Sequence, residues 1–229
     1  MPAEISIPRI IARFVTGFGV LAAVFFWSAG TFNWPEAWLY LVIQFLISGA
    51  EAVWLKRNDP ELLKERMTFL KSSAKGWDKA FMWISTVVSI PYLLLPGLDA
   101  VRYQWSLVPI PVQAIAFGGV IASLLLVFRV LRENPFLSRV VEVQRERSHR
   151  VITTGPYRVV RHPMYTGVVV LFFCIPLALG SLWSLIPAAL LAALIIVRIP
   201  LEEKTLHAEL EGYSAYAGRV QYRLFPGVW

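Results

Sequence analysis

Charged residues and cysteine are both scarce in this chain, and each scarcity excludes a class of protein. Only 16% of the 229 residues are charged, whereas 57% are hydrophobic and the mean hydropathy is +0.59. A soluble domain carries roughly 25% charged residues. A soluble chain of this length could not bury so much apolar surface. The composition therefore predicts a membrane protein.

Several kinds of functional site are excluded in the same way. The single cysteine, Cys174, lies within an apolar run, so neither an intramolecular disulfide nor a cysteine-based metal cage is expected. The sequence has no H-E-x-x-H zinc motif, no G-x-G-x-x-G, no G-x-x-x-x-G-K-[ST] and no G-x-S-x-G. We therefore predict no metal site, no Rossmann unit, no phosphate-binding loop and no nucleophile elbow.

The net charge of +7 does not indicate nucleic-acid binding. The basic residues are spread over short connections between apolar runs, so no soluble face gathers them. The first apolar run begins at Ile10, is as long as a spanning helix and lacks an A-x-A-like cleavage site. We expect it to be retained as the first transmembrane helix.

Long apolar runs predict the architecture, because a spanning helix needs about 20 apolar residues. The candidate runs are 10–29, 36–55, 80–98, 107–131 and 165–199. The last is too long for one crossing, and Gly180, Ser181 and Trp183 interrupt it, which predicts a hairpin of two short helices. We therefore predict a single all-α domain, residues 1–229, forming a multi-pass transmembrane bundle of six crossings. Five crossings with one re-entrant or tilted segment is the alternative.

The basic residues predict the orientation of this bundle. With six crossings, every Lys and Arg except Arg102 falls on one side of the membrane. These basic residues lie near the N-terminus and in or beside the segments 56–79, 132–164 and 200–229. The positive-inside rule places that side, and both termini, in the cytosol. Five crossings would move the last basic residues outside, so we prefer six.

The first cytosolic segment, 56–79, predicts a helix. Asp59 can cap it, with Pro60 at its first position. The apolar side of this helix would be formed by Leu62, Leu63, Met67, Phe69 and Leu70. This pattern favours an interfacial helix on anionic lipid headgroups. A wall of a substrate entrance is the alternative.

Chemically capable residues gather in the other two cytosolic segments. All three histidines lie there, namely His149, His162 and His207, as do most of the glutamates. The densest stretch is 148–167, where Gly155–Pro156 predicts a turn and Pro163 excludes His162 from helical geometry. Non-helical backbone beside a membrane requires burial or a cavity. We therefore predict a lined pocket here.

Arg198 and Glu202 are spaced to lie on one face of the last helix. A snorkelling arginine with a helix-stabilising ion pair explains this spacing, and a ligand site is the alternative. The available arginine, histidine, tyrosine and glutamate side chains suit a zwitterionic, partly aromatic ligand.

At these residues the chain resembles the isoprenylcysteine carboxyl methyltransferase family of integral membrane enzymes, and especially its bacterial relatives. The first motif is Gln144, His149-x-Val151-x-x-x-Gly155-Pro156-Tyr157-x-x-x-Arg161-His162-Pro163-x-Tyr165-x-Gly167. The second is Arg198-x-x-x-Glu202-Glu203-x-x-Leu206, followed by Tyr213-x-x-Tyr216-x-x-Arg219. The motif core covers residues 129–229, while residues 1–128 share only the helical pattern. Phospholipid-methylating enzymes and a membrane thiol methyltransferase group are also similar.

The resemblance implies that the protein uses S-adenosylmethionine, releases S-adenosylhomocysteine and works in the bacterial cytoplasmic membrane. The cofactor-binding positions that it implies are Gln144, His149, Arg150, Val151, Ile152, Tyr157, His162, Pro163, Met164, Tyr165 and Glu202. It assigns Arg198 to the substrate, and the spacing from Arg198 favours Glu202 over Glu203. Arg198 and Glu202 are the expected catalytic residues.

A lipophilic acceptor entering from the bilayer is the expected partner, with no nucleic acid. Arg198 could hold a carboxylate in line for methylation, so carboxylate O-methylation is favoured. An amine or a thiol would need a base such as Glu202. Phospholipid N-methylation and small-thiol S-methylation are therefore the enzymatic alternatives. A membrane scaffold or transporter component is the non-enzymatic one.

Overall fold

The computed structural model describes residues 7–67 and 75–229, and this part of the chain is helical without a strand. The α-helices are α1 Ile7–Ala29, α2 Pro35–Asn58, α3 Pro60–Met67, α4 Gly76–Pro96, α5 Ile110–Glu133, α6 Pro163–Ala178, α7 Leu185–Glu209 and α8 Tyr213–Arg219. A π-helical turn, Gly97–Arg102, continues α4, and short 3-10 turns occur at Arg145–Arg147 and Gly155–Arg158. The predicted all-α fold is confirmed.

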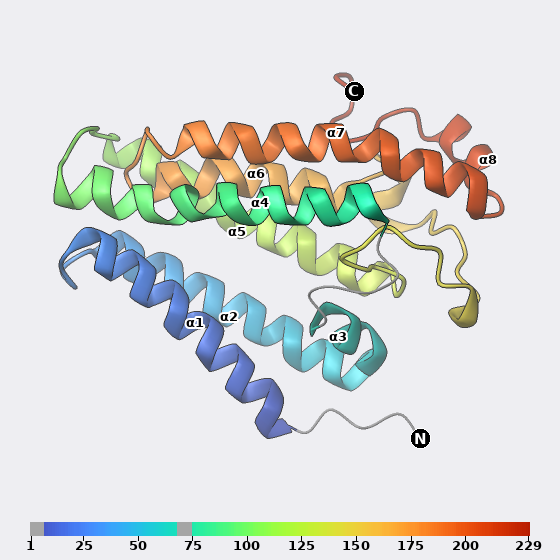
Figure 1. The fold of residues 1–229 in the computed structure, drawn as a ribbon, viewed down its shortest axis with the longest axis horizontal. Coiled ribbons are helices and arrows are strands. Elements are labelled where there is room, and N and C mark those ends of the chain that lie inside the picture. Colours follow the sequence, from blue (N-terminus) through green and yellow to red (C-terminus); the bar gives the residue numbers. More distant parts are fainter. Residues whose placement is uncertain (1–6, 68–74) are drawn as a thin grey trace.

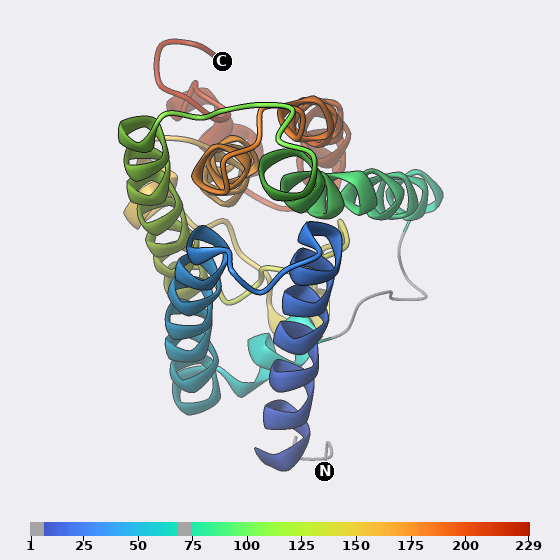
Figure 2. The same cartoon turned by 90° about the vertical axis from the view of Figure 1, so that its left-hand side faces the viewer.

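The six longer helices lie side by side and run alternately in opposite directions (Figure 1). The short connections 30–34, 103–109 and 179–184 lie together at one end, at the left of Figure 1. Helices α3 and α8 and the long connection between α5 and α6 lie at the other end. Seen from the end with the short connections, α6 and α7 lie on one side of the molecule and α1 and α2 on the other (Figure 2). The polar segments are therefore collected at one end of the bundle.

Within residues 7–67 and 75–229, five helices are long and apolar enough to cross a membrane. The predicted hairpin is present, because 165–199 is divided into α6 and α7 near Gly180, which has a φ of +84°. The prediction of two short helices is wrong for α7, which continues past Pro200 to Glu209 and has 25 residues. Helix α6 has 16 residues. At 1.5 Å per residue it spans about 24 Å, less than the roughly 30 Å of the hydrocarbon core. Six crossings therefore remain a prediction.

The boundaries of α4 and α5 differ from the predicted ones. Helix α5 begins at Ile110 rather than at Leu107, because Pro109 takes an extended conformation and serves as its N-cap. Helix α4 is longer than predicted at both ends, beginning at Gly76 and continuing through the π-helical turn to Arg102. The longer α4 places Asp78 within its first turn.

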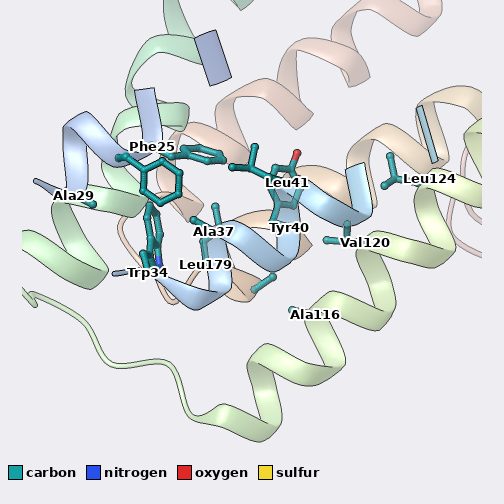
Figure 3. Packing of buried hydrophobic residues seen from close by; sticks show 12 residues of the cluster. Phe25, Ala29, Trp34, Ala37, Tyr40, Leu41, Ala116, Val120, Leu124 and Leu179 are labelled. Atoms are coloured by element: carbon teal, nitrogen blue, oxygen red, sulfur yellow. The ribbon is translucent and has the colours of Figure 1, made fainter. Parts of the chain in front are cut away.

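The largest apolar core joins the N-terminal helices to α5 and to the end of α6. Phe25 of α1 packs edge-on against Trp34 and Tyr40, with ring centroids 5.9 and 5.8 Å apart (Figure 3). Val120 of α5 and Leu179 complete this core and are fully buried. Between membrane helices such packing stabilises through close van der Waals contact, because lipid tails are as apolar as these side chains.

Gly97 allows α1 and α4 to approach each other closely. A Cβ atom at this position would lie 2.1 Å from Ser28 Oγ and 2.7 Å from the backbone nitrogen of Ala29. Since these distances are far below van der Waals contact, only glycine fits at the crossing. The same turn carries the fully buried Asp99, whose Oδ2 accepts hydrogen bonds from Ser106 Oγ (2.5 Å) and Ser181 Oγ (2.6 Å). These bonds tie the α6–α7 connection to the end of α4.

Helix α3 begins as predicted but does not present its apolar side to lipid. The backbone N–H of Leu62 donates to Asp59 Oδ1 at 2.9 Å, which confirms the cap. Leu62 and Leu63 are buried against Leu55 of α2 and Leu131 of α5. The interfacial arrangement is therefore wrong at these two residues, because the side chains pack on protein. Phe69 and Leu70 lie outside the described residues.

Candidate active site

A cavity of about 440 Å³ lies at the end of the bundle that carries the long connections. Its size falls within the range of ordinary small-molecule sites. The wall is built from α3, α4, the α5–α6 connection, α6, α7 and α8. Segments far apart in the sequence therefore meet around it. We call it the main cavity.

Arg198 enters the wall from the middle of α7 and is 7% exposed. Its Nη2 lies 2.9 Å from Asp78 Oδ1 and donates to the carbonyl oxygen of Arg139 at 2.8 Å. Its Cζ lies 4.4 Å from the centroid of the Phe81 ring, a cation–π distance. The ion pair suggested by the spacing to Glu202 is not the one formed, because Arg198 pairs with α4 instead.

Glu202 lies one turn after Arg198 and also lines the main cavity. The hydroxyl of Tyr165 donates to Glu202 Oε2 at 2.6 Å. His162 Nδ1 is 3.9 Å from Glu202 Oε1, and the His162 ring stacks on Tyr165 with centroids 5.6 Å apart. The carboxylate is thus oriented by a phenol while its other oxygen faces the imidazole.

The adjacent Glu203 has a different environment. Arg161 Nε donates to its Oε1 at 2.6 Å and Arg223 Nε donates to its Oε2 at 2.8 Å, while the side chain is almost fully buried. The backbone N–H groups of Arg161 and His162 donate to the carbonyls of Tyr222 and Arg223, both at 2.9 Å. Glu203 therefore fastens the C-terminal segment over the start of α6.

Aromatic residues form a second part of the wall. The hydroxyl of Tyr157 accepts from Asn134 Nδ2 at 2.8 Å, and the Tyr157 carbonyl accepts from the hydroxyl of Tyr216, also at 2.8 Å. Burial raises the pKa of Tyr157 well above its usual range and that of Tyr216 to about 12, so both phenols are neutral. His149 stacks on Phe136 with centroids 4.5 Å apart.

Burial, reinforced by the nearby Arg147, lowers the pKa of His149 below its ordinary value. The ring is therefore uncharged at neutral pH, and its Nδ1 can accept the backbone N–H of Gln144 at 3.3 Å. A neutral ring stacked on Phe136 suits contact with a flat, uncharged ligand group.

Three buried polar atoms around the main cavity have no hydrogen-bond partner within the described part of the chain. They are Arg198 Nε, Tyr213 Oη and Ser85 Oγ, from α7, α8 and α4. A buried donor without a partner costs about 1–3 kcal/mol. The three side chains line the cavity, but these particular atoms are covered by neighbouring protein atoms.

Most residues implied by the family resemblance meet at this cavity. The lining includes His149, Arg150, Val151, Ile152, Tyr157, His162, Pro163, Met164, Tyr165, Arg198 and Glu202. Gln144 does not line it. Its Nε2 donates to the carbonyl of Phe136 and its Oε1 accepts from Arg147 Nη1, both at 2.9 Å. In this structure Gln144 shapes the α5–α6 connection.

Sequence reasoning missed the contributions of α3 and α4. Arg66 of α3 and Phe81 of α4 line the main cavity, and Asp78 lies behind Arg198. Burial lowers the pKa of Arg66, and the nearby positive charge of Arg139 lowers it further. For Arg66, the sequence contained one indication: the alternative interpretation of segment 56–79 as a wall of a substrate entrance.

A second cavity, of about 480 Å³, lies between the N-terminal helices and α4, α5 and α6. Its lining is mainly apolar, with Phe18, Leu21 and Leu124 among its residues. Val168 and Phe172 of α6 line both cavities, so the two adjoin within the bundle.

The described residues contain no cluster of three or more histidine, cysteine, aspartate or glutamate side chains placed to hold a metal ion. The wall of the main cavity instead offers carboxylate, guanidinium and aromatic groups. These groups suit an organic, zwitterionic ligand.

A comparison with protein families adds an independent finding. The model of the phospholipid methyltransferase family matches residues 113–211. Over these residues the chain is similar to a phospholipid methyltransferase. The match runs from α5 through α7 and includes the first motif, Arg198 and Glu202, but not α3 or α4. No curated protein matches the chain. The family match and the apolar helices together support an integral membrane methyltransferase.

Proposed function

We propose that the protein is an S-adenosylmethionine-dependent methyltransferase that acts on a lipophilic acceptor drawn from the bilayer. The observation that carries this proposal is the pair Arg198 and Glu202, which line one cavity one helical turn apart within the matched region. A guanidinium and a carboxylate at this spacing suit a zwitterionic headgroup.

The residues of the main cavity fit the cofactor. S-adenosylmethionine has an aromatic base, a zwitterionic amino-acid end and a sulfonium that makes its methyl group electrophilic. Residues 149–152 and Tyr157 would hold the cofactor on one side, and His162, Tyr165 and Glu202 would hold it on the other. Tyr213 and Tyr216 add aromatic surface to the same wall, which suits the base.

The second cavity supports a lipophilic acceptor. Because it adjoins the main cavity at Val168 and Phe172, a hydrocarbon chain can lie among the membrane helices while its polar end reaches Arg198. Placing the reactive group beside Glu202 in this way makes methyl transfer effectively unimolecular, which is worth up to about 7–11 kcal/mol.

A phospholipid amine is the acceptor that we favour. The wall contains the carboxylate of Glu202, which an amine acceptor needs as a proton acceptor and a carboxylate acceptor does not. The family match favours a phospholipid as well. In this assignment Arg198 would bind the phosphate, and Glu202 would accept the proton that the amine must lose before it attacks.

Carboxylate methylation of an isoprenylcysteine-like acceptor is the second candidate. The motifs spanning residues 144–219 support it, as does the position of Arg198 in the wall of the main cavity. Such an acceptor needs no base, so Glu202 would serve only to hold the cofactor.

Isothermal titration of the purified protein with S-adenosylhomocysteine tests the cofactor site. We expect His162→Ala and Tyr157→Phe each to weaken binding about tenfold or more, because each removes a polar group from the wall. Glu211→Gln is the matched control, since this exposed residue does not line the cavity. Unchanged affinity in both wall variants would contradict the site.

Transfer of a labelled methyl group identifies the acceptor. The substrates are phosphatidylethanolamine, a prenylated cysteine and a small thiol, each incubated with labelled cofactor. A labelled phospholipid amine supports the favoured assignment, and a labelled ester supports the second candidate. If the protein neither binds S-adenosylhomocysteine nor labels any lipid extract, a scaffold or transporter component is favoured instead.

A further inference from the structure

Asp78 is a fully buried carboxylate that lies behind the wall of the main cavity without lining it. It stands in the first turn of α4. Its Oδ2 accepts the backbone N–H of Val141 at 2.8 Å, and its Oδ1 lies 2.9 Å from Arg198 Nη2. One carboxylate therefore joins α4, the α5–α6 connection and α7.

These contacts hold the guanidinium of Arg198 from one side. Nη2 is shared between Asp78 and the carbonyl of Arg139, while the ring of Phe81 lies against the guanidinium carbon. Phe81 is on the same helix as Asp78, three residues later, so both contacts come from one face of α4. Arg198 itself lines the main cavity. The wall thus fixes the guanidinium through Nη2 and through its carbon atom.

We propose that Asp78 is the positioning residue for Arg198, setting the direction in which the guanidinium meets the polar end of the acceptor. This inference rests on the proposed function. Asp78 acts through Arg198 because its own carboxylate does not reach the cavity. It also keeps the buried guanidinium balanced in charge when no acceptor is bound.

If Asp78 positions Arg198, its substitution should impair the use of the acceptor but not the binding of the cofactor. In Asp78→Asn we expect kcat/KM for the acceptor to fall about tenfold or more, with the affinity and stoichiometry of S-adenosylhomocysteine binding unchanged. Unchanged stoichiometry shows that the variant is folded. A purely structural role would lower the stoichiometry or weaken both ligands together.

A double-mutant cycle tests whether Asp78 acts through Arg198. In an Arg198→Gln background, adding Asp78→Asn should change acceptor kcat/KM by less than about twofold, because the group that Asp78 orients is gone. A further loss of about tenfold in the double variant would overturn the inference. The double variant remains informative even if the Asp78→Asn single variant fails to fold. Both charges of this ion pair are removed in the double variant, so neither is left buried without its partner.

Asp59→Asn is the matched control. Asp59 lies directly before α3 at the same end of the bundle and, like Asp78, accepts a backbone N–H, but its ionic neighbour is Arg147 rather than Arg198. We expect its substitution to leave acceptor kcat/KM within about twofold. Absence of activity in the wild-type protein would overturn the proposed function itself. An active wild type with additive variants would overturn only the role of Asp78.

Discussion

At the residue scale, two neighbouring glutamates have opposite surroundings. Glu202 faces the main cavity with one oxygen bonded to Tyr165, whereas both oxygens of Glu203 are held by arginines. Adjacent positions on a helix point about 100° apart, so only one of the two can face a given cavity. Glu202 is therefore placed to act on a ligand, whereas Glu203 is placed to stabilise the fold.

Substitution of the two glutamates should separate activity from stability. We expect Glu202→Gln to lower methylation of an amine acceptor about a hundredfold, as for loss of a general base. For a carboxylate acceptor the change should be much smaller, because no proton has to be removed. The measurement is initial rate at saturating cofactor, with thermal unfolding of the same preparation as the check on folding.

Glu203→Gln should mainly lower the stability of the protein. It leaves Arg161 buried without its charged partner, which we expect to cost about 2–3 kcal/mol of unfolding free energy. Thermal unfolding of the detergent-solubilised protein measures this. A variant as stable as wild type would contradict the role of Glu203 as the fastening of the C-terminal segment.

The sequence predicted the residues of the wall far better than the contacts that orient them. The motif residues 149–165 and Glu202 meet at one cavity because they flank a short hairpin, which the pattern of Gly180 and Ser181 already indicated. Asp78 could not be predicted, because its partner Arg198 is distant in sequence and is reached only after α4 packs on α7.

At the element scale, the crossing of α1 and α4 depends on the absence of a side chain at Gly97. Its φ of −69° is open to any residue, so the requirement is for space rather than for backbone freedom. The sequence showed a glycine after Pro96 but not the helix that would press against it.

Gly97→Ala should therefore destabilise the bundle through packing alone. The added methyl would overlap Ser28 and the backbone of Ala29, and overpacking of this kind costs about 1–3 kcal/mol. Gly17→Ala is the matched control, because a Cβ there meets nothing within 4 Å. We expect the control to unfold at the wild-type temperature. Equal unfolding temperatures for both variants would contradict the close crossing.

At the scale of the whole molecule, the number of crossings decides which segments share a compartment. The basic residues predict six crossings, which puts the end of α2 and the end of α7 on the same side. Five crossings put them on opposite sides. The short α6 is the element on which this choice depends.

Cysteine labelling distinguishes the two topologies. In a Cys174→Ala background, single cysteines replace Asn33, Arg57 or Glu211, all exposed. With an impermeant maleimide on inside-out vesicles, we expect positions 57 and 211 to react and position 33 to be protected. Labelling of position 57 alone would establish five crossings, because positions 33 and 211 would then both lie on the outer side and be protected.

The ion pair between Asp78 and Arg198 limits how this protein can recombine with its relatives. A crossover between α4 and α5 would look safe, because the motif core and the region matched by the family model both lie largely beyond it. Yet such a hybrid would inherit the arginine from one parent and its carboxylate from the other. Transfer of this motif core into a relative should therefore preserve activity only when the relative's own α4 supplies an acid in its first turn, so the two halves are inherited as a unit.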